Sequence, residues 1–305
     1  MSTISSLQSS PRASNLRRRY VVIVNPATRG NAEVLLSAVR AAAPAWASLD
    51  IHFTTGEPIA TDLFSSEEDL AAIVAIGGDG TVADVAQAIG DFDVPLGIVP
   101  GGSTNIIARN LRIPASPAES AHAVFRDNRE LRIDVGLCNG RRFLHMAGAG
   151  FDSRLFMATN RRLKRHFGWL AYLPGAAQSV MLPPADFTLR VDHVTVDIVS
   201  PMILVANGAA VIHPAFPIYP GIRSDDGWLD IIAFSATRLD QMVESLARLA
   251  TRSLDRSPYA FHLRGRSVSM TSDPPMPLQI DGDVIGETPA TFTIAERALR
   301  ILVPR

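Results

Sequence analysis

The sequence predicts an α/β domain with a doubly wound parallel sheet, followed by an all-β domain that forms an antiparallel β-sandwich. Strand-like apolar runs alternate with helical patterns over the first third of the 305 residues. After about Asp134, short runs with period-two alternation replace that pattern. Since 47% of the residues are hydrophobic, the chain can bury the cores of two domains.

The first domain is expected to contain four parallel strands separated by helices. Residues 70–76 are apolar on both faces, which is typical of a parallel strand that helices cover on both sides. In such a sheet a ligand binds at the carboxyl ends of the strands. The expected strands are residues 20–24, 51–53, 70–76 and 95–99, and the expected helices are residues 31–42, 82–89 and 103–111.

The second domain is expected to consist mainly of short antiparallel strands. Residues 187–191 and 194–198 alternate with period two across an Asp192-His193 turn, which indicates a hairpin. Further strands are expected at residues 202–205, 229–234, 261–263, 268–270 and 278–280, with one helix at residues 239–249. We divide the chain into a disordered tail (1–18), an α/β domain (19–135), a sandwich domain (136–296) and a terminal strand (297–305) that could return to the first domain.

Composition restricts the classes of function. A formal net charge of -1 gives no global field that would steer nucleic acid, so we expect no nucleic-acid partner. The single cysteine, Cys138, excludes a disulfide framework and fits a reducing cytoplasm. No run approaches the ~18 apolar residues of a membrane-spanning helix. Lys164 is the one lysine, so a P-loop is absent and phosphate contacts must use backbone N–H groups, arginines and a metal.

Two glycine-rich loops follow neighbouring strands of the first domain. Gly77-Gly78-Asp79-Gly80-Thr81 ends one strand, and Pro100-Gly101-Gly102-Ser103-Thr104-Asn105 ends the next. Glycines let backbone N–H groups face an anion, and the helix that follows adds its positive N-terminus. Asp79 would hold a Mg²⁺ that bridges phosphates, or fix the loop. A single loop could be a tight turn with Asp79 or Thr81 as a helix cap, but two adjacent loops favour phosphate.

Two other strand ends should lie at the same edge of the sheet. Asn25-Pro26-Ala27-Thr28-Arg29-Gly30 follows the first strand, and Thr55 follows the second. Because the carboxyl ends of parallel strands meet at one edge, these segments and the two glycine-rich loops should line one polar crevice. The sequence therefore predicts a nucleotide site there.

These motifs together resemble the diacylglycerol kinase catalytic-domain family, which includes bacterial soluble lipid kinases and, more distantly, sphingosine kinases. The resemblance covers roughly residues 20 to 305. It rests on the ordered set Asn25-Pro26, GGDGT at 77–81, PGGSTN at 100–105 and IDGD at 280–283. It implies a nucleotide-binding α/β domain, a β-sandwich domain, and transfer of the γ-phosphate of ATP to a lipid hydroxyl.

The resemblance also implies ligand-binding positions. Asp134 matches an aspartate that supports a metal–phosphate network, and Asp226 matches the side-chain ligand of a structural Mg²⁺ loop to which Arg223 and Trp228 add backbone carbonyls. An Asp-Gly turn that opens a strand is the alternative for that loop. The positions expected to bind ATP with Mg²⁺ are Asn25, Pro26, Ala27, Thr28, Gly30, Thr55, Gly77, Gly78, Asp79, Gly80, Thr81, Gly102, Ser103, Asn105 and Asp134.

The Asp281-Gly282-Asp283 motif is expected to supply the proton acceptor. The family usually has Asp-Gly-Glu here, and we assign the base to Asp283, with Asp281 as the second candidate. A phosphoryl-transfer transition state is loose, so the base mainly orients the hydroxyl and takes its proton late. An ordinary aspartate pKa of about 3.9 leaves the carboxylate able to accept it. The alternative is a β-turn in which both aspartates only cap backbone groups.

The chain departs from the family pattern at several positions. Ser103 and Asp283 replace residues of similar chemistry, Thr and Glu. Ala83 and Ile106 stand where Asn and Asp are common, so polar groups near the nucleotide are lost. His145 replaces a common Asn and receives no catalytic role.

Three functions remain open from the sequence. The first is an ATP- and Mg²⁺-dependent kinase that acts on diacylglycerol or a related lipid alcohol. The others are an NAD kinase-like enzyme and a diverged non-catalytic protein that binds nucleotide or lipid. The sequence has no Asn-Glu dipeptide, which NAD kinases usually carry for ribose recognition.

A lipid acceptor implies transient contact with the inner face of the membrane by a protein we expect to be cytoplasmic. Residues 154–173 mix basic and apolar side chains, so they either dock on anionic lipid or, as we favour, form an interdomain helix with a solvated basic face. A homo-oligomer is compatible with the sequence.

Overall fold

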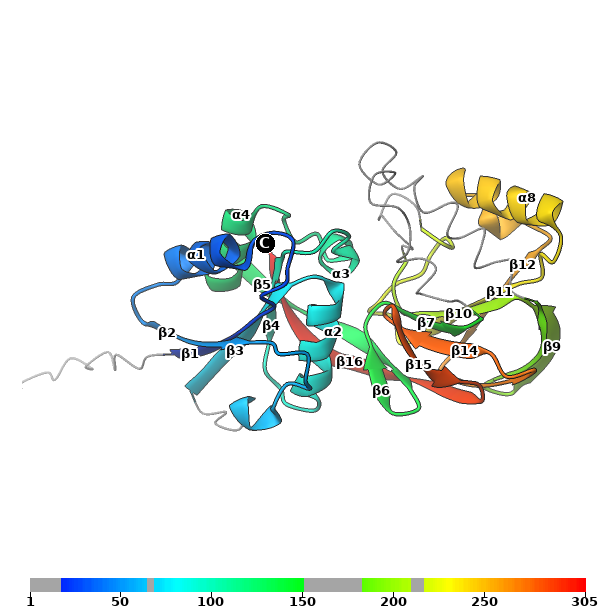
Figure 1. The fold of residues 1–305 in the computed structure, drawn as a ribbon, viewed down its shortest axis with the longest axis horizontal. Coiled ribbons are helices and arrows are strands. Elements are labelled where there is room, and N and C mark those ends of the chain that lie inside the picture. Colours follow the sequence, from blue (N-terminus) through cyan, green and yellow to red (C-terminus); the bar gives the residue numbers. More distant parts are fainter. Residues whose placement is uncertain (1–17, 65–68, 151–182, 210–216) are drawn as a thin grey trace, which may run out of the picture.

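The computed structural model describes residues 18–64, 69–150, 183–209 and 217–305, which form two domains side by side (Figure 1). The α/β domain and the β-sandwich predicted from the sequence are both present. Residues 1–17 of the predicted tail and the segment 154–173 lie outside the described residues. Arg18, which we assigned to the tail, is instead the first residue of a strand.

The first domain is built on parallel strands whose carboxyl ends are aligned. Val24 pairs with Phe53 on one side and with Ile76 on the other, and Gly77 pairs with Pro100. This register brings the four strand ends to one edge, as predicted. The strands, in order across the sheet, are β2 (Ala47–Phe53), β1 (Arg18–Val24), β3 (Leu70–Gly77) and β4 (Leu96–Pro100).

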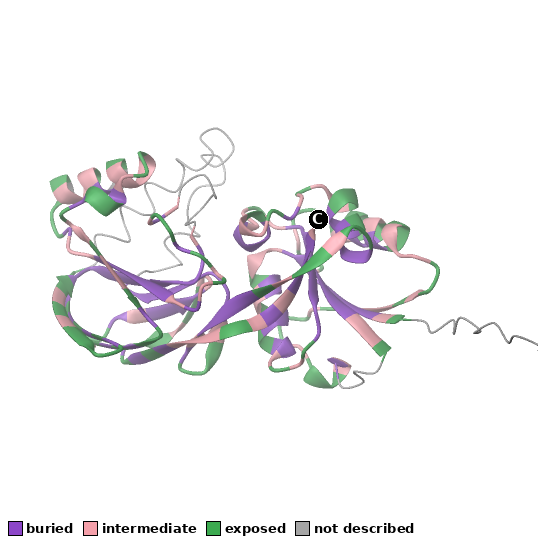
Figure 2. Cartoon of the chain, turned by 180° about the vertical axis from the view of Figure 1, so that it is seen from behind, coloured by how far each residue is buried: buried purple, intermediate pink, exposed green. Residues whose placement is uncertain are grey.

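Helices cover both faces of this sheet because its strands are apolar on both sides. Val22 packs with Leu35 on one face, while Ile23 packs with Val85 on the other. Figure 2 shows the resulting buried layer along the strands. The helices are α1 (Ala32–Ala42) and α4 (Pro117–Phe125) on the first face, and α2 (Asp79–Ile89), α3 (Ile106–Asn110) and the 3₁₀ turn η1 (Thr61–Phe64) on the second.

The second domain is a sandwich of two sheets with a shared apolar core. Phe143, Phe187 and Phe292 from one sheet meet Ile231 and Leu278 from the other. One sheet contains β5 (Asn128–Cys138), β6 (Arg141–Phe143), β8 (Ala185–Val191), β9 (Val194–Ser200), β13 (Ser267–Asp273) and β16 (Ala290–Pro304). The other contains β7 (Met146–Ala149), β10 (Met202–Ala206), β11 (Leu229–Phe234), β12 (Ala260–Gly265), β14 (Pro277–Ile280) and β15 (Asp283–Glu287).

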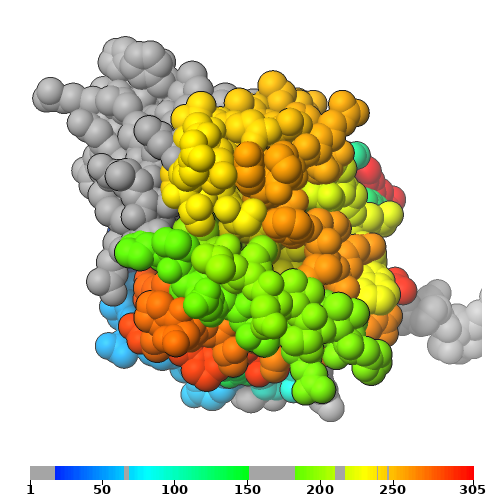
Figure 3. Space-filling model, turned by 90° about the vertical axis from the view of Figure 1, so that its right-hand side faces the viewer, coloured from blue at the N-terminus to red at the C-terminus, as the bar shows by residue number. Residues whose placement is uncertain are grey.

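A helix and an edge strand form the far end of the sandwich. Figure 3 shows α8 (Leu239–Ala250) above β9 at this end, and the 3₁₀ turn η4 (Leu254–Arg256) follows α8. Within the described segments, no helix is long and apolar enough to cross a membrane.

The long strand β16 joins the two domains into one continuous sheet. Its first half pairs with β13, and Ile301 near its end pairs in parallel with Leu96 of β4. β5 runs antiparallel to β16 along both halves. The last strand of the chain thus lies between β4 and β5 in the first domain and between β13 and β5 in the sandwich.

Several elements differ from the sequence predictions. α4, β5, β6 and β7 were not predicted, because charged residues interrupt the first half of β5 and the other elements are short. The helix expected over residues 103–111 begins only at Ile106, since Asn105 has a left-handed backbone with φ of 47°. α2 begins three residues earlier than expected, at Asp79, inside the glycine-rich loop.

Candidate active site

The three loops at the carboxyl ends of β1, β3 and β4 hold one another through backbone hydrogen bonds. The N–H of Asn25 donates to Ile76 O at 3.0 Å, that of Gly101 to Gly77 O at 2.7 Å, and that of Gly30 to Gly101 O at 2.9 Å. These contacts fix the relative positions of the loops.

Glycine is required in these loops for close packing as well as for any ligand. A Cβ on Gly102 would lie 2.7 Å from the Cα of Gly78, and one on Gly101 would lie 2.5 Å from Oγ1 of Thr28. Both distances are far below van der Waals contact. The glycine pattern therefore has a structural cause that is independent of phosphate binding.

Polar side chains of the loops are engaged within the site. Asp79 Oδ1 accepts the N–H of Ile107 at 3.0 Å, which ties α2 to α3, so Asp79 fixes the loop. Asn25 donates through Nδ2 to Thr81 Oγ1 at 3.1 Å, and its Oδ1 accepts the N–H of Ala27. Asn105 Oδ1 accepts the N–H of Gly102 at 2.8 Å. The N-terminal turn of α2 has Gly78 as its N-cap and no side-chain cap.

A cavity of about 730 Å³ opens beside these loops. This volume is within the usual range of small-molecule sites. Four predicted residues line it: Asn25, Pro26, Ala27 and Thr55. The other predicted nucleotide positions are not among its lining residues; they are Thr28, Gly30, Gly77, Gly78, Asp79, Gly80, Thr81, Gly102, Ser103, Asn105 and Asp134.

The sequence analysis missed most of the cavity wall. The cavity is lined by the segment after β2, which begins at Thr54, and by one face of α2. Arg141 of β6 completes the wall. Glu57 lies after the second strand, where related α/β folds place an acidic ribose ligand, and that position was a usable signal. No sequence signal marked the α2 residues or Arg141. The missed residues are Thr54, Gly56, Glu57, Pro58, Ile59, Thr61, Asp84, Gln87, Ala88 and Arg141.

The sandwich domain reaches the cavity through β6, which is attached to α2. The backbone N–H of Arg142 donates to Gln87 Oε1 at 2.8 Å, and the Arg142 guanidinium pairs with Asp91. This attachment places the neighbouring residue, Arg141, in the cavity wall. The wall is therefore formed by both domains.

The pKa of Asp84, on the face of α2 that lines the cavity, departs from its ordinary value. Burial raises the pKa of Asp84 above its ordinary value, the Asp283 carboxylate raises it further, and the Arg141 guanidinium lowers it. Asp283 opens β15 and is exposed.

Asp281 occupies a different environment from Asp283. Its carboxylate accepts the N–H groups of Leu144, His145 and Met146 at 2.7 to 3.0 Å. Burial raises the pKa of Asp281, while these three N–H groups and His145 act in the opposite direction. This arrangement caps backbone groups, which was the alternative considered for the motif.

Asp134 is fully buried at the junction between the domains. Its two carboxylate oxygens accept the N–H groups of Gly227 and Arg297, both at 2.7 Å. Its own N–H donates to Ser224 O. Asp134 therefore holds the turn before β11 against β16.

The segment expected to bind a structural Mg²⁺ already contains a cation. Asp226 Oδ2 pairs with the Arg264 guanidinium, and Asp226 Oδ1 accepts the N–H of Trp228 at 3.2 Å. Arg264 also bonds Asp230 and lies 5.6 Å from the centre of the Trp228 ring. Among the residues described, no three His, Cys, Asp or Glu side chains form a metal-binding group. Arg264 therefore balances the charge of Asp226 in this structure, and the Mg²⁺ loop of Asp226, Arg223 and Trp228 stays a prediction.

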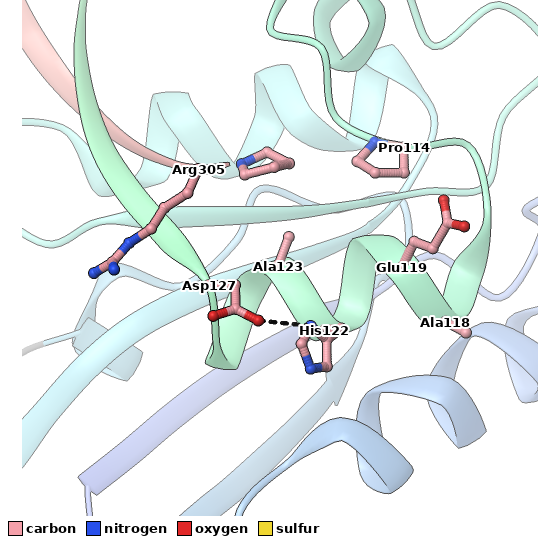
Figure 4. Close-up of a pocket in the computed structure, with 8 residues that line it drawn as sticks. Pro114, Ala118, Glu119, His122, Ala123, Asp127 and Arg305 are labelled. Carbon is pink, nitrogen blue, oxygen red and sulfur yellow. Dashed lines mark ion pairs between the residues drawn. The ribbon is translucent and has the colours of Figure 1, made fainter.

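A second, smaller cavity of about 440 Å³ lies between α4 and the C-terminus (Figure 4). His122 and Asp127 form an ion pair at its wall, with 3.9 Å between Nδ1 and Oδ2. None of the predicted site residues line this cavity.

Comparison with known protein families matches both domains. Residues 19–138 match the diacylglycerol kinase catalytic domain. Residues 145–303 match the YegS C-terminal NAD kinase beta sandwich-like domain. The two matches follow each other in the order in which the domains occur in the structure.

Curated relatives align over most of the chain. An uncharacterised protein of Synechocystis sp. is 30% identical over 305 residues, which cover 93% of this chain and 70% of the relative. A diacylglycerol kinase of Staphylococcus carnosus is 24% identical over 243 residues, 78% of each chain.

Solved structures share the fold. The crystal structure of a diacylglycerol kinase from Bacillus anthracis superposes with a TM-score of 0.68 at 20% identity, and it covers 94% of this chain and 97% of that chain. Another structure from the same organism gives a TM-score of 0.76 at 22% identity over the same shares. From these matches and the site described above, the chain belongs to the diacylglycerol kinase catalytic-domain family and is a phosphotransferase of the lipid kinase type.

Proposed function

We propose that this protein transfers the γ-phosphate of MgATP to the hydroxyl of diacylglycerol or a related lipid alcohol. One observation carries the proposal: the cavity beside the glycine-rich loops has walls from both domains, since β6 of the sandwich domain places Arg141 beside α2 of the first domain. In this proposal the first domain binds the nucleotide and the sandwich domain supplies the proton acceptor, Asp283 of β15. The relatives named diacylglycerol kinase supply the substrate class.

The reaction assigned to this site balances as a single displacement. The lipid hydroxyl oxygen forms a bond to the γ-phosphorus, the bond from that phosphorus to the β-phosphate oxygen breaks, and ADP leaves. The hydroxyl proton passes to the Asp283 carboxylate, which is exposed. The products are ADP and the phosphorylated lipid.

The glycine-rich loops would bind the phosphates of the nucleotide through backbone N–H groups and the positive end of a helix. The N-terminus of α2 presents backbone N–H groups and a positive dipole at Gly78–Gly80, without a side-chain cap to compete with an anion. Asp79 and Asn105 keep the loop shapes, so their contribution to nucleotide binding would be indirect. Mg²⁺ would enter as part of the MgATP substrate.

Transfer to a lipid also requires that the acceptor reach the site from a bilayer. We include a transient contact with the inner face of the membrane in this proposal, made by a cytoplasmic protein. Formation of a homo-oligomer is compatible with the proposed lipid kinase activity.

The test is transfer of labelled γ-phosphate to a panel of mixed-micelle lipids and to NAD. We expect label in a chloroform-soluble product, loss of about 10²-fold or more in rate for Asp283→Asn, and substantial retention for Asp283→Glu, which keeps the carboxylate. Label in NAD would identify the NAD kinase-like alternative. Binding of ATP without transfer to any acceptor would instead support the non-catalytic alternative.

A further inference from the structure

The connection between β6 and β7 reaches from the sandwich domain into the first domain. Leu144 is buried and belongs to the apolar core of the first domain, together with Ile106 and Ile107 of α3. The next residue, His145, is 7% exposed, and its imidazole lies at the same helix, with 3.4 Å between its Nδ1 and Nδ2 of Asn110. Two successive residues of the sandwich domain are therefore anchored in the first domain.

The backbone of His145 is held by the sandwich domain. Its N–H donates to Asp281 Oδ1 at 2.9 Å, and its carbonyl oxygen accepts the N–H groups of Asn207 and Gly208, both at 2.9 Å. Gly208 also packs against the ring, since a Cβ there would lie 2.3 Å from Nδ1 of His145. The imidazole is thus closely packed, and its backbone is fixed in the sandwich domain.

His145 lies in the middle of a series of contacts between the two predicted halves of the active site. On one side, Ile107 of α3 donates its N–H to Asp79 Oδ1 in the GGDGT loop at 3.0 Å. On the other side, the Asp281 carboxylate accepts three consecutive backbone N–H groups, among them that of His145. Asp283, the proposed proton acceptor, follows Asp281 by two residues. The contacts therefore run from the glycine-rich loop to the Asp-Gly-Asp turn.

We propose that His145 is a positioning residue, which fixes the Asp-Gly-Asp turn of the sandwich domain relative to the GGDGT loop of the first domain. This inference rests on the proposed function for the reaction that the alignment serves. In that reaction the phosphate and its acceptor are held by different domains, so the rate depends on their relative position. His145 acts through Asn110 and Asp281 and touches neither reactant.

For His145→Ala we expect kcat for phosphoryl transfer to a lipid to fall about tenfold to a hundredfold, because small displacements of reacting groups have effects of this size. The KM for ATP should change by less than about threefold, since the glycine-rich loops keep their own hydrogen bonds. His145→Asn should restore most of kcat. Its side chain places a polar atom close to the position of Nδ1 and can still bond Asn110.

The alternative is that His145 only stabilises the junction as a packed side chain. Met270→Ala is the control, because it removes a fully buried side chain of the sandwich core on β13. It should lower the melting temperature and leave kcat within about twofold of the wild type, measured where the variant is folded. The same behaviour of His145→Ala would overturn the inference.

Asn110→Ala tests the contact from the first domain, at the half-buried end of α3. It should lower kcat in the wild-type background and cause no further loss in the His145→Ala background, because the two residues act through one contact. Fully additive losses would contradict the proposal. If His145→Ala does not fold, Asn110→Ala decides alone, and a kcat within about twofold of the wild type would count against the link.

Urea denaturation of the same variants needs no activity. Asn110→Ala should lower the midpoint by roughly 0.3 M in the wild-type background and leave it unchanged in the His145→Ala background. If the wild type phosphorylates no lipid, the proposed function fails, and this comparison decides the link: equal shifts in both backgrounds would refute it. If lipid is phosphorylated at the same kcat by wild type and His145→Ala, the proposed function stands and the positioning role fails.

Discussion

Two aspartates of identical chemistry, Asp281 and Asp283, receive different roles from their surroundings. Asp281 is bonded to three backbone N–H groups from residues 135 to 137 positions away. Asp283 starts β15 with its carboxylate exposed. Sequence reasoning placed Asp283 before Asp281 as the candidate base but could not foresee the capping role of Asp281, because the partners of Asp281 belong to a distant segment.

Asp281→Ala is expected to destabilise the fold and not only to slow the reaction. It leaves the N–H groups of Leu144, His145 and Met146 without an acceptor, which should lower the free energy of unfolding by about 2–5 kcal/mol. Urea denaturation measures the change. Asp283→Ala is the matched control and should unfold at the wild-type midpoint. A wild-type midpoint for Asp281→Ala would contradict the capping role.

At the scale of elements, the loops after β1, β3 and β4 behave as one unit. They are joined by backbone hydrogen bonds and by the close approach of Gly78 and Gly102. Any nucleotide bound there would meet a surface that is already fixed before binding. This preorganisation reduces the entropy lost on binding.

Gly102→Ala should disturb this unit. The added Cβ would lie 2.7 Å from Gly78 Cα, and backbone cannot move aside cheaply. We expect a loss of about 1–3 kcal/mol in the free energy of unfolding, as for other overpacked sites, together with weaker ATP binding. Gly80→Ala is the matched variant for stability, because nothing lies within 4 Å of its added Cβ. Thermal melts that show the two variants equally stable would refute this account.

The strongly patterned elements were predictable and the short ones were not. β1, β3, α1, α8 and the β8–β9 hairpin follow clear apolar periodicities. By contrast, β6 and β7 have three and four residues; β6 pairs with the end of β5 just before it, and β7 depends on pairing with the distant strands β10 and β14. A strand of that length carries too little periodicity to stand out from a loop. Because β6 was not predicted, Arg141 was not expected to line the cavity.

At the scale of the whole molecule, β5 and β16 bind the two domains into one structure. The pairing of these strands spans both cores with an irregularity between Ala295 and Leu299, and Asp134 ties the turn at Gly227 to β16 at Arg297. The domains therefore cannot separate without breaking strand pairing. The cavity wall shared by α2 and β6 depends on this rigid connection.

Asp134→Ala tests that connection. Removing the buried carboxylate leaves two N–H groups without acceptors, so the free energy of unfolding should fall by about 2–4 kcal/mol. Asp225→Ala is the control, since its carboxylate pairs with Arg223 at the surface and should contribute about 0–1 kcal/mol. Denaturation followed by Trp fluorescence and circular dichroism gives both values. A change in Asp134→Ala no larger than the control would rule out the junction role.

The sequence by itself determined the order of the two domains, the glycine-rich loops at the strand ends and the family, because these depend on local periodicity and on contiguous motifs such as GGDGT. Only the tertiary structure decided that Asp281 caps backbone, that Arg264 neutralises Asp226 and that Arg141 faces the cavity. Each of these roles depends on a partner far away in the chain. Such partners are selected by strand pairing and domain packing, which leave no local pattern in the sequence.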